Sequence, residues 1–240
     1  MATSDFRFKQ FTIRHDRSAM KVGTDGVLIG AWAQVPQKEE ASPHPNVLDV
    51  GTGTGLIALM LAQRFPTAKI VGIDIDDASV EQAKENVKST PFKAQISIQK
   101  QDFSNLDSSF NKYDLIVSNP PFYTEDTLSG KDARDIARHT TSLPFETLVA
   151  NTTKLLIKGG LFCVIIPYQS ASDFISVCVT NRLYLTRRLN IRSKENKSFN
   201  RVMLEFSTTI QPAETKTLTL YNDHRERTPE YTQLTQDFYL

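Results

Sequence analysis

The run from Val47 to Gly55 constrains the fold of this 240-residue chain more than any other segment. It reads Val-Leu-Asp-Val-Gly-Thr-Gly-Thr-Gly and continues into an apolar stretch that favours a helix. Glycines let the backbone approach a ligand closely, and the free N–H groups at a helix start face that ligand. The run therefore predicts a strand, a ligand-binding turn at Gly51, Gly53 and Gly55, and a helix.

Two further strand-like runs end in acidic residues. Ile70–Asp74 is apolar, and Asp74 lies at about the spacing expected for a carboxylate that binds ribose hydroxyls. The run that begins at Ile96 ends in Asp102 and Phe103, an acid and an aromatic ring that could bind and cover an adenine. Taken alone, Asp102 fits an ordinary strand-end acid better, and such glycine turns are shared by NAD and S-adenosylmethionine proteins.

The most informative motif for function is Asn119-Pro120-Pro121-Phe122, which follows the apolar run 113–118. Two prolines fix φ and remove two backbone donors, so the turn cannot relax into a helix or a sheet ladder. The Asn119 side-chain oxygen and the Pro120 carbonyl are acceptors, and Phe122 adds a flat aromatic face. A planar ring carrying an NH2 group fits this arrangement. A proline-rich loop with Phe122 as a core residue is the alternative.

Strand-like and helix-like runs alternate from residue 46 onward, which predicts a mostly parallel sheet with helices on both faces. The expected strands are 46–50, 69–74, 95–99, 113–118 and 160–166, and the expected helices are 55–64, 77–88, 144–156 and 169–180. Each motif falls at the end of a strand, where such sheets bind ligands. After residue 180, the runs 184–192 and 201–208 predict a hairpin.

The segment 1–45 is expected to form a cap that packs on a core domain of residues 46–240. Residues 6–13 suggest a short strand or hairpin, and 24–33 a helix capped by Thr24 or Asp25. Residues 34–46 contain three prolines and suggest a surface loop.

Composition favours a cytoplasmic globular protein, with 40% hydrophobic and 23% charged residues. No apolar run reaches the length of a transmembrane helix, and the polar first 20 residues do not resemble a signal peptide. Cys163 and Cys178 lie in apolar contexts, and we interpret them as buried thiols rather than as a disulfide or metal site. Trp32 is expected in the core.

The order of the four motifs resembles class I S-adenosylmethionine-dependent methyltransferases that methylate amines. Residues 8–33 and 236–240 are similar to the corresponding ends of the bacterial tRNA1(Val) (adenine(37)-N6)-methyltransferases, which modify the adenosine just 3′ of the anticodon. The resemblance implies a Rossmann-like, mostly parallel seven-stranded sheet with an antiparallel C-terminal edge hairpin. It also implies S-adenosyl-L-methionine as cofactor, tRNA as partner, and methyl transfer to N6 of adenosine 37.

The resemblance also implies roles for the motif residues. Gly51, Gly53 and Gly55 would hold the methionine part of the cofactor, Asp74 its ribose, and Asp102 and Phe103 its adenine. Asn119, Pro120 and Phe122 would form the catalytic site for the target amine, and Asn119 would also contact the cofactor. Pro121 and Phe122 would contact the target base. Lys21, Gly23, Thr24 and Asp25 would close over the methionine end, although a helix cap and turn fit them equally well. The polar segment 123–142 is a candidate lid, and we interpret His139 within it as a solvated residue.

A basic cluster suggests where RNA binds. Residues 182–201 contain seven basic residues and one acidic residue, whereas the whole chain carries a net charge of only +1. We interpret Arg187, Arg188, Arg192 and Lys194 as phosphate contacts, although most charge clusters are solvated faces. A monomer is expected.

Three other functions compete with this one. Asn-Pro-Pro-aromatic turns also serve enzymes that methylate guanine N2 of ribosomal RNA or a glutamine of release factors. An NAD(P)-dependent oxidoreductase would share the glycine turn but has no use for the Asn119–Phe122 turn. An RNA-binding module with a relic pocket would not need both acids and that turn.

Overall fold

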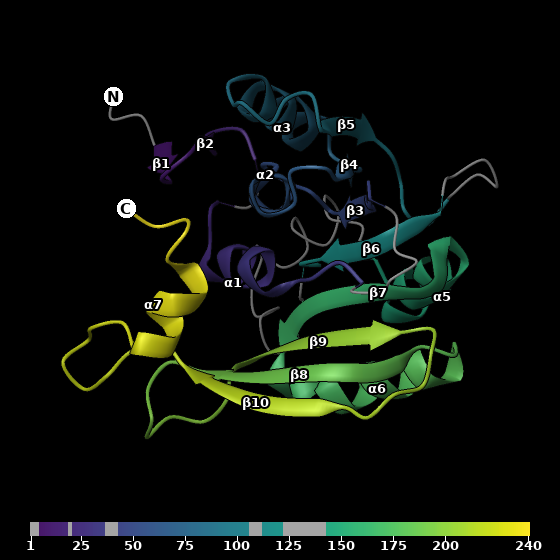
Figure 1. Cartoon of the computed structure of the whole chain (residues 1–240), viewed down its shortest axis with the longest axis vertical. Helices are drawn as coiled ribbons and strands as arrows, with labels where there is room; N and C mark the ends of the chain where they lie inside the picture. The colour runs from purple at the N-terminus through teal and green to yellow at the C-terminus, as the bar shows by residue number, and fades with distance from the viewer. Residues whose placement is uncertain (1–4, 19–20, 37–42, 106–111, 122–142) are drawn as a thin grey trace, which may run out of the picture.

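A single twisted sheet forms the centre of the molecule, shown as a computed structural model in Figure 1. Residues 5–18, 21–36, 43–105, 112–121 and 143–240 are described. The eight strands of the sheet follow the order β10-β8-β9-β7-β6-β3-β4-β5. They are β3 (Asn46–Val50), β4 (Lys69–Asp74), β5 (Ile96–Lys100), β6 (Tyr113–Ser118), β7 (Leu156–Pro167), β8 (Tyr184–Arg192), β9 (Arg201–Ser207) and β10 (Glu214–Thr219). Only β9 runs antiparallel to its neighbours.

The alternation of strands and helices predicted from the sequence is confirmed. The helices are α1 (Thr24–Trp32), α2 (Leu56–Arg64), α3 (Asp77–Lys88), α5 (Phe145–Leu155), α6 (Ala171–Thr180) and α7 (Pro229–Thr235). The sheet has eight strands instead of the seven expected, because residues 214–219 form β10 and pair in parallel with β8. The hairpin of β8 and β9 therefore has a further strand on its outer side. None of the described helices combines the length and the apolar character needed to cross a bilayer.

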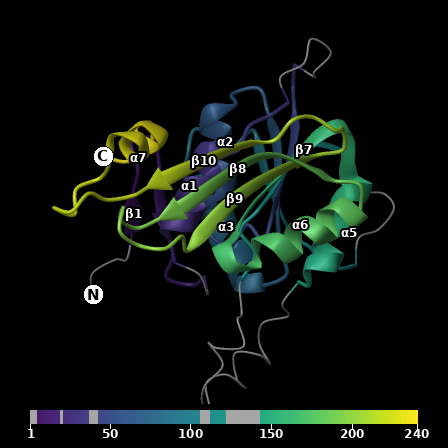
Figure 2. The same ribbon diagram turned by 90° about the horizontal axis from the view of Figure 1, so that it is seen from below.

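Helices cover both faces of the sheet, as Figure 2 shows from below for α5 and α6 beside β7–β9. On one face, α1 and α2 pack on alternate strand residues such as Val47, Ile70 and Leu115. On the other face, α5 and α6 pack on the intervening residues, such as Leu48 and Ile116. This division follows from the two-residue period of a strand, whose successive side chains point to opposite faces. Cys163 and Cys178 are both buried free thiols, and Trp32 is buried, as expected.

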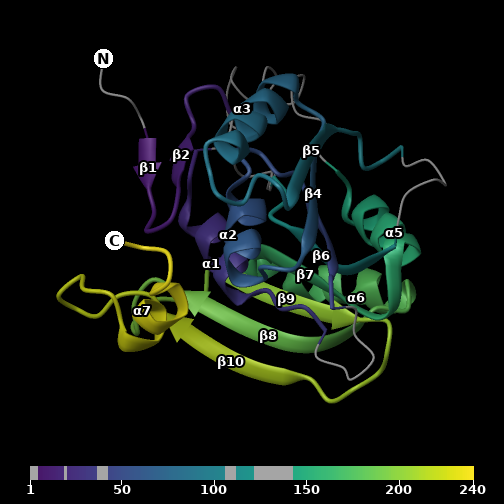
Figure 3. The ribbon, with the colours of Figure 1, turned by 45° about the horizontal axis from the view of Figure 1, so that its top comes forward.

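The N-terminal segment packs on the C-terminal one, and β1 lies beside the chain end in Figure 3. Strands β1 (Asp5–Arg7) and β2 (Thr12–Arg14) form an antiparallel hairpin. The Tyr239 ring lies 6.1 Å from the rings of both Phe6 and Phe8. Both ends of the chain therefore share one hydrophobic core with α1 and α2.

The N-cap of helix α1 is the residue before Thr24, and not Thr24 or Asp25 as expected. Gly23 is the N-cap and makes no side-chain capping bond, so Thr24 is already helical. The Asp25 carboxylate pairs instead with the Arg201 guanidinium at 2.8 Å. This ion pair joins the first turn of α1 to the first residue of β9.

Candidate active site at the carboxyl edge of the sheet

One row of register partners runs across the sheet and aligns the predicted site residues. It passes through Gln99, Ile73, Val50, Ser118, Val164, Leu204 and Arg188, on β5, β4, β3, β6, β7, β9 and β8 respectively. Asp74, Gly51 and Asn119 each directly follow a member of this row. Because neighbouring strands lie about 4.8 Å apart, these three residues begin a single site at the carboxyl edge.

The glycine turn has the backbone that its sequence predicts. Gly51, Gly53 and Gly55 have φ values of 72°, 54° and 81°, in the left-handed region that side chains disfavour. Gly55 is also the N-cap of α2, so the unpaired N–H groups of that helix begin at the turn. A Cβ on Gly51 would meet no heavy atom within 4 Å, which leaves open space on that side of the turn.

A buried carboxylate supports the turn from below. Asp49 Oδ2 accepts hydrogen bonds from Thr52 Oγ1 at 2.6 Å and from the Ala58 N–H at 3.2 Å. Burial raises the pKa of Asp49 from 3.8 to about 7, although both hydrogen bonds oppose the shift. Its Oδ1 has no hydrogen-bond partner in the described part of the chain, which agrees with a carboxyl group that tends to hold a proton. Asp49 is therefore a structural residue of the site.

Asp74 binds the same turn from the neighbouring strand. Its Oδ2 accepts from the Gly53 N–H at 2.8 Å, and its Oδ1 accepts from the Asp76 N–H at 3.0 Å. Burial raises the pKa of Asp74, opposed by these backbone hydrogen bonds. A carboxylate has about four lone-pair sites, so roughly two remain for a ligand. Asp76 serves a different purpose, because it caps α3 by accepting from the Ser79 N–H at 2.8 Å.

Asp102 and Phe103 differ in how well they fit their predicted roles. Asp102 follows β5 beside Asp74, and its two oxygens accept from the Ser104 N–H and the Asn105 side chain, both at 2.8 Å. Its remaining lone pairs can still accept from a ligand. The Phe103 ring is only 4% exposed and packs in the core under α5. Little of Phe103 is accessible to an adenine, and its role as a cover for the adenine stays a prediction.

Ile75 offers the exposed apolar surface that Phe103 lacks. It directly follows Asp74 and is 45% exposed, which is unusual for an isoleucine next to a buried strand. Its sequence context, between two acids, gave no hint of this role. An exposed apolar side chain beside a carboxylate at a strand end suits a flat heterocycle.

The Asn119 turn lies at the end of β6, next to the glycine turn. Ser118 Oγ donates to the Val50 carbonyl at 3.0 Å and ties β6 to β3 where both strands end. Asn119 and Pro121 are partly exposed, and Pro120 is buried. The Asn119 side chain has no hydrogen-bond partner among the described residues, so its acceptor is available. Phe122, His139 and the expected lid 123–142 lie outside the described residues.

The N-terminal segment reaches the glycine turn through one asparagine. The Asn86 side chain of α3 donates to the carbonyls of Arg14 and Thr54, both at 2.9 Å, and accepts from the Arg14 N–H at 3.0 Å. Ser18 follows this contact, and its Oγ would lie 3.9 Å from a Cβ on Gly53. The segment after β2 therefore forms one wall of the site, whereas Lys21 is exposed and contributes no described contact to it.

The four basic residues predicted to bind RNA do not form one uniform surface. Arg187 points toward α1, where it pairs with the buried Glu205 carboxylate and covers the Trp32 ring at 4.1 Å. Arg188 and Arg192 lie on the opposite face of β8, and Lys194 Nζ donates to the Asp223 carbonyl at 3.3 Å in the turn beyond. Arg187 is therefore a core ion-pair partner, and its assignment to phosphate is corrected.

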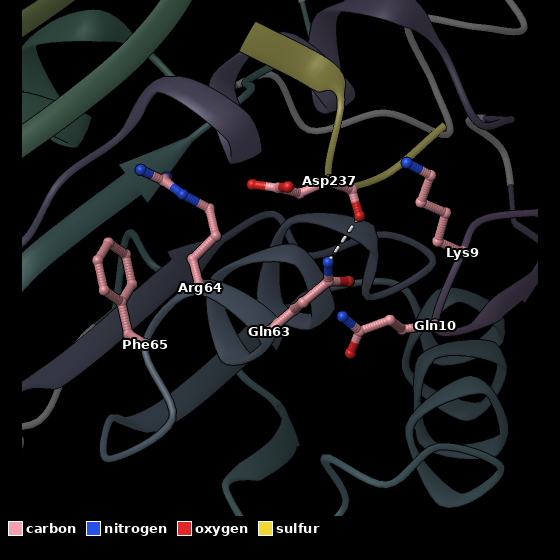
Figure 4. Close-up of a pocket in the computed structure, with 6 residues that line it drawn as sticks. All are labelled: Lys9, Gln10, Gln63, Arg64, Phe65 and Asp237. Atoms are coloured by element: carbon pink, nitrogen blue, oxygen red, sulfur yellow. Dashed lines mark hydrogen bonds between the residues drawn. The ribbon is translucent and has the colours of Figure 1, made fainter. Parts of the chain in front are cut away.

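The hollow drawn in Figure 4 lies away from all of these residues. It has a volume of about 500 Å³ and is lined by Lys9, Gln10, Gln63, Arg64, Phe65 and Asp237. Residues 63–65 are at the end of α2 opposite to the glycine turn. Gln63 Nε2 donates to the Asp237 carbonyl at 2.8 Å across the hollow. The hollow therefore lies where α2 contacts the C-terminal segment.

Comparison with known proteins agrees with this geometry. The family model "Methyltransferase small domain" matches residues 34–174. The tRNA1(Val) (adenine(37)-N6)-methyltransferase of Bacteroides thetaiotaomicron is 42% identical over 100% of this chain and 99% of its own length. The protein of the same name from Pectobacterium carotovorum is 40% identical over 98% of this chain and 93% of its own length.

A solved structure shares the fold. A protein from Agrobacterium tumefaciens described as a predicted O-methyltransferase superimposes with a TM-score of 0.69 at 16% identity, over 89% of this chain and 96% of its own. At this level of identity the likeness concerns the fold alone. It extends beyond the matched family domain to most of the chain.

Proposed function

This chain belongs to the family of tRNA1(Val) (adenine(37)-N6)-methyltransferases, and we propose that it transfers a methyl group from S-adenosyl-L-methionine to the N6 amine of adenosine 37 in tRNA1(Val). The observation that carries the proposal is the full-length identity of 42% to a relative of that name. It agrees with an Asn119 side chain that lies beside the glycine turn and has no partner among the described residues. A tRNA substrate also supports a cytoplasmic location.

The glycine turn and the adjacent acids suit S-adenosylmethionine. The open backbone at Gly51 leaves room for the methionine carboxylate, and the N–H groups at the start of α2 can donate hydrogen bonds to it. The free lone pairs of Asp74 can accept from the ribose hydroxyls, and those of Asp102 from the adenine amine. Ile75 would pack on the adenine face. The cofactor supplies an electrophilic methyl carbon on its sulfonium, so the enzyme's task is to prepare the acceptor.

Asn119 and Pro120 prepare the adenine amine, which accepts the methyl group, by hydrogen bonding to it. The N6 lone pair of adenine is delocalised into the ring, which makes the amine a poor nucleophile. The Asn119 side-chain oxygen and the Pro120 carbonyl can each accept a hydrogen bond from one N–H group of the amine. These two hydrogen bonds favour a pyramidal nitrogen whose lone pair can face the methyl group. As the N–C bond forms, the S–C bond of the cofactor would break and S-adenosylhomocysteine would leave. The methylated nitrogen would then be acidic enough to lose its proton to water, so no strong base is needed. Catalysis then rests on positioning and electrostatics.

The target adenosine suits a site of this kind because it lies in an anticodon loop. Such a base is already unpaired, so turning it into the site costs less than extruding it from a duplex. We assign Pro121 and Phe122 to the walls of the base site by their place after Asn119. Stacking on an aromatic ring contributes about 1–3 kcal/mol per base.

The test is the identity and position of the methylated nucleoside. Purified protein, a cofactor with a deuterated methyl group and unmodified tRNA1(Val) should give N6-methyladenosine at position 37, detected by mass spectrometry of nuclease fragments. A tRNA with guanosine at that position serves as the matched control and should stay unmethylated. Methylation of guanine in ribosomal RNA or of a release-factor glutamine, with none in this tRNA, would overturn the proposal.

A further inference from the structure

An aromatic pair flanked by arginines lies at the carboxyl edge of β7, outside the cofactor and amine sites. The Tyr168 and Phe199 rings are 5.1 Å apart with an interplanar angle of 37°. The Arg188 guanidinium lies 5.4 Å from the centre of the Tyr168 ring, and that of Arg192 lies 5.6 Å from the centre of the Phe199 ring. Both rings are partly exposed, although neither belongs to a motif that the cofactor chemistry uses.

The backbone holds this pair in place. Tyr168 directly follows β7, and its N–H donates to the Asn200 carbonyl at 3.2 Å. The Asn200 N–H in turn donates to the Ile191 carbonyl at 3.0 Å. The loop that carries Phe199 is therefore fastened between β7 and β8, and the two rings are brought together by the fold.

The pair lies at the same edge as Asn119. Ser118, which precedes Asn119, belongs to the register row that also contains Arg188, three strand spacings away. At about 4.8 Å per spacing, these backbones are roughly 14 Å apart. A single strand of nucleic acid with a rise of about 3.4 Å per nucleotide covers that distance in about four nucleotides.

We propose that Tyr168 and Phe199 stack an unpaired base that flanks the target adenosine, while Arg188 and Arg192 contact the adjoining phosphates. The combination of partly exposed rings with guanidinium groups matches the chemistry of single-stranded RNA, in which flat bases alternate with negative charges. Arg188 also donates from Nε to Asn190 Oδ1 at 2.8 Å, which orients its guanidinium along the face of β8. This inference rests on the proposed function, since it takes the target strand to pass from Asn119 toward β8.

The test compares Phe199→Leu with Phe199→Tyr. Leucine retains apolar volume but cannot stack, whereas tyrosine retains the ring. We expect Phe199→Leu to weaken binding of an anticodon stem-loop RNA by about tenfold to a hundredfold, with S-adenosylhomocysteine affinity and melting temperature unchanged. Phe199→Tyr should remain within about twofold of the wild type. Arg188→Gln should lower the slope of log Kd against log salt by about one, and Phe199→Leu should leave that slope unchanged.

Abasic substitutions in the RNA identify the stacked base. One abasic position within about four nucleotides of the target should weaken wild-type binding tenfold or more and have no further effect on Phe199→Leu. Equal affinity of the leucine variant and the wild type, or full additivity at every abasic position, would overturn the proposal. If the wild type methylates no adenosine in any tRNA, the proposed function itself fails. If the wild type does methylate the tRNA and the variants bind the RNA alike, only the proposed stacking on the aromatic pair fails.

Discussion

The two halves of the sheet's carboxyl edge commit their polar groups in different ways. On the β3–β4–β5 side, the carboxylates of Asp49, Asp74 and Asp76 all accept hydrogen bonds from backbone N–H groups. On the β7–β9–β8 side, the guanidinium groups contact other side chains, mostly aromatic rings and acids. Backbone donors are fixed by the fold, whereas long side chains can exchange partners at little cost. The first half therefore holds fixed hydrogen-bonding groups, whereas the second holds side chains that can exchange partners, as the proposed RNA contacts require.

Arg187 is an exception among the guanidinium groups of the β7–β9–β8 side, because it pairs with a buried carboxylate. It neighbours Arg188 in sequence, yet the Glu205 side chain with which it pairs is only 5% exposed. Thr186 Oγ1 also donates to Glu205 Oε1 at 2.7 Å, so the carboxylate is the centre of a buried polar cluster. The following changes test the contrast between fixed and exchangeable groups, beginning with the largest expected effect.

Arg187→Ser should destabilise the fold strongly, because it leaves the Glu205 carboxylate buried without its counter-charge. Removing one partner of a buried pair typically costs about 3–5 kcal/mol. The free energy of unfolding in urea measures the effect. Arg188→Ser is the matched control and should cost roughly 1 kcal/mol or less. If Arg187→Ser melts like the wild type but loses tRNA affinity, then Arg187 belongs with the RNA contacts after all.

Asn119→Ala should lower kcat by about a hundredfold to a thousandfold, because it removes one preorganised acceptor from the amine. Isothermal titration with S-adenosylhomocysteine should show cofactor affinity within about twofold of the wild type. Asn119→Asp retains an acceptor oxygen and should keep more activity than the alanine variant. Near-normal turnover by Asn119→Ala would remove this residue from the proposed chemistry.

Asp74→Ala should act on the cofactor and not on the RNA. Each lost hydrogen bond between a ribose hydroxyl and the carboxylate is worth about 1.5–3 kcal/mol at most. The variant also frees the Gly53 N–H, which loosens the turn and adds to the loss. Asp74→Asn keeps one acceptor oxygen and should lose less. Unchanged titration of S-adenosylhomocysteine against Asp74→Ala would contradict the ribose assignment.

Asp49 should give the fold a measurable pH dependence. Its folded-state pKa of about 7 lies above the ordinary value of 3.8, so the folded protein holds a proton that the unfolded chain has lost between those limits. The stability contributed by this group is therefore complete below about pH 4 and declines as the pH rises to about 7. Asp49→Asn should flatten the melting temperature between pH 5 and 8 relative to the wild type. Parallel curves for the two proteins would show that the carboxyl group is ionised throughout.

The sequence was sufficient for the elements that its hydrophobic pattern bounds sharply. Strands β3, β4 and β6 and helix α3 begin and end where predicted, because apolar runs there stop at glycines, prolines or capping acids. The glycine turn was predictable because its conformation requires glycine. The places of Asn119 and Asp74 were also predictable, because each polar residue directly follows or ends an apolar strand.

Three features depended on contacts that the sequence does not display. The charge cluster was read as one surface, but successive residues of a strand alternate between its faces, so Arg187 shares the α1 face with Leu189 and Ile191 and Arg188 lies on the other face. The Phe103 carbonyl accepts a hydrogen bond of 2.8 Å from Asn151 Nδ2 on α5, which is 48 residues away in the sequence. The Phe103 ring packs into the core beside this contact. Strand β10 has too few apolar residues to be recognised without the partner strand against which it pairs.

The composition of β10 has a consequence for how the molecules behave in a crowded solution. An outermost strand presents unpaired backbone groups onto which another chain can add a strand of its own. The first four residues of β10, Glu-Thr-Lys-Thr, are exposed, and Lys216 pairs with Glu214 at 2.7 Å. An incoming strand would have to bury these charges and hydroxyls, so this edge resists polymerisation. The strand that carries the least sequence signal thus disfavours the addition of a further strand at this edge of the sheet.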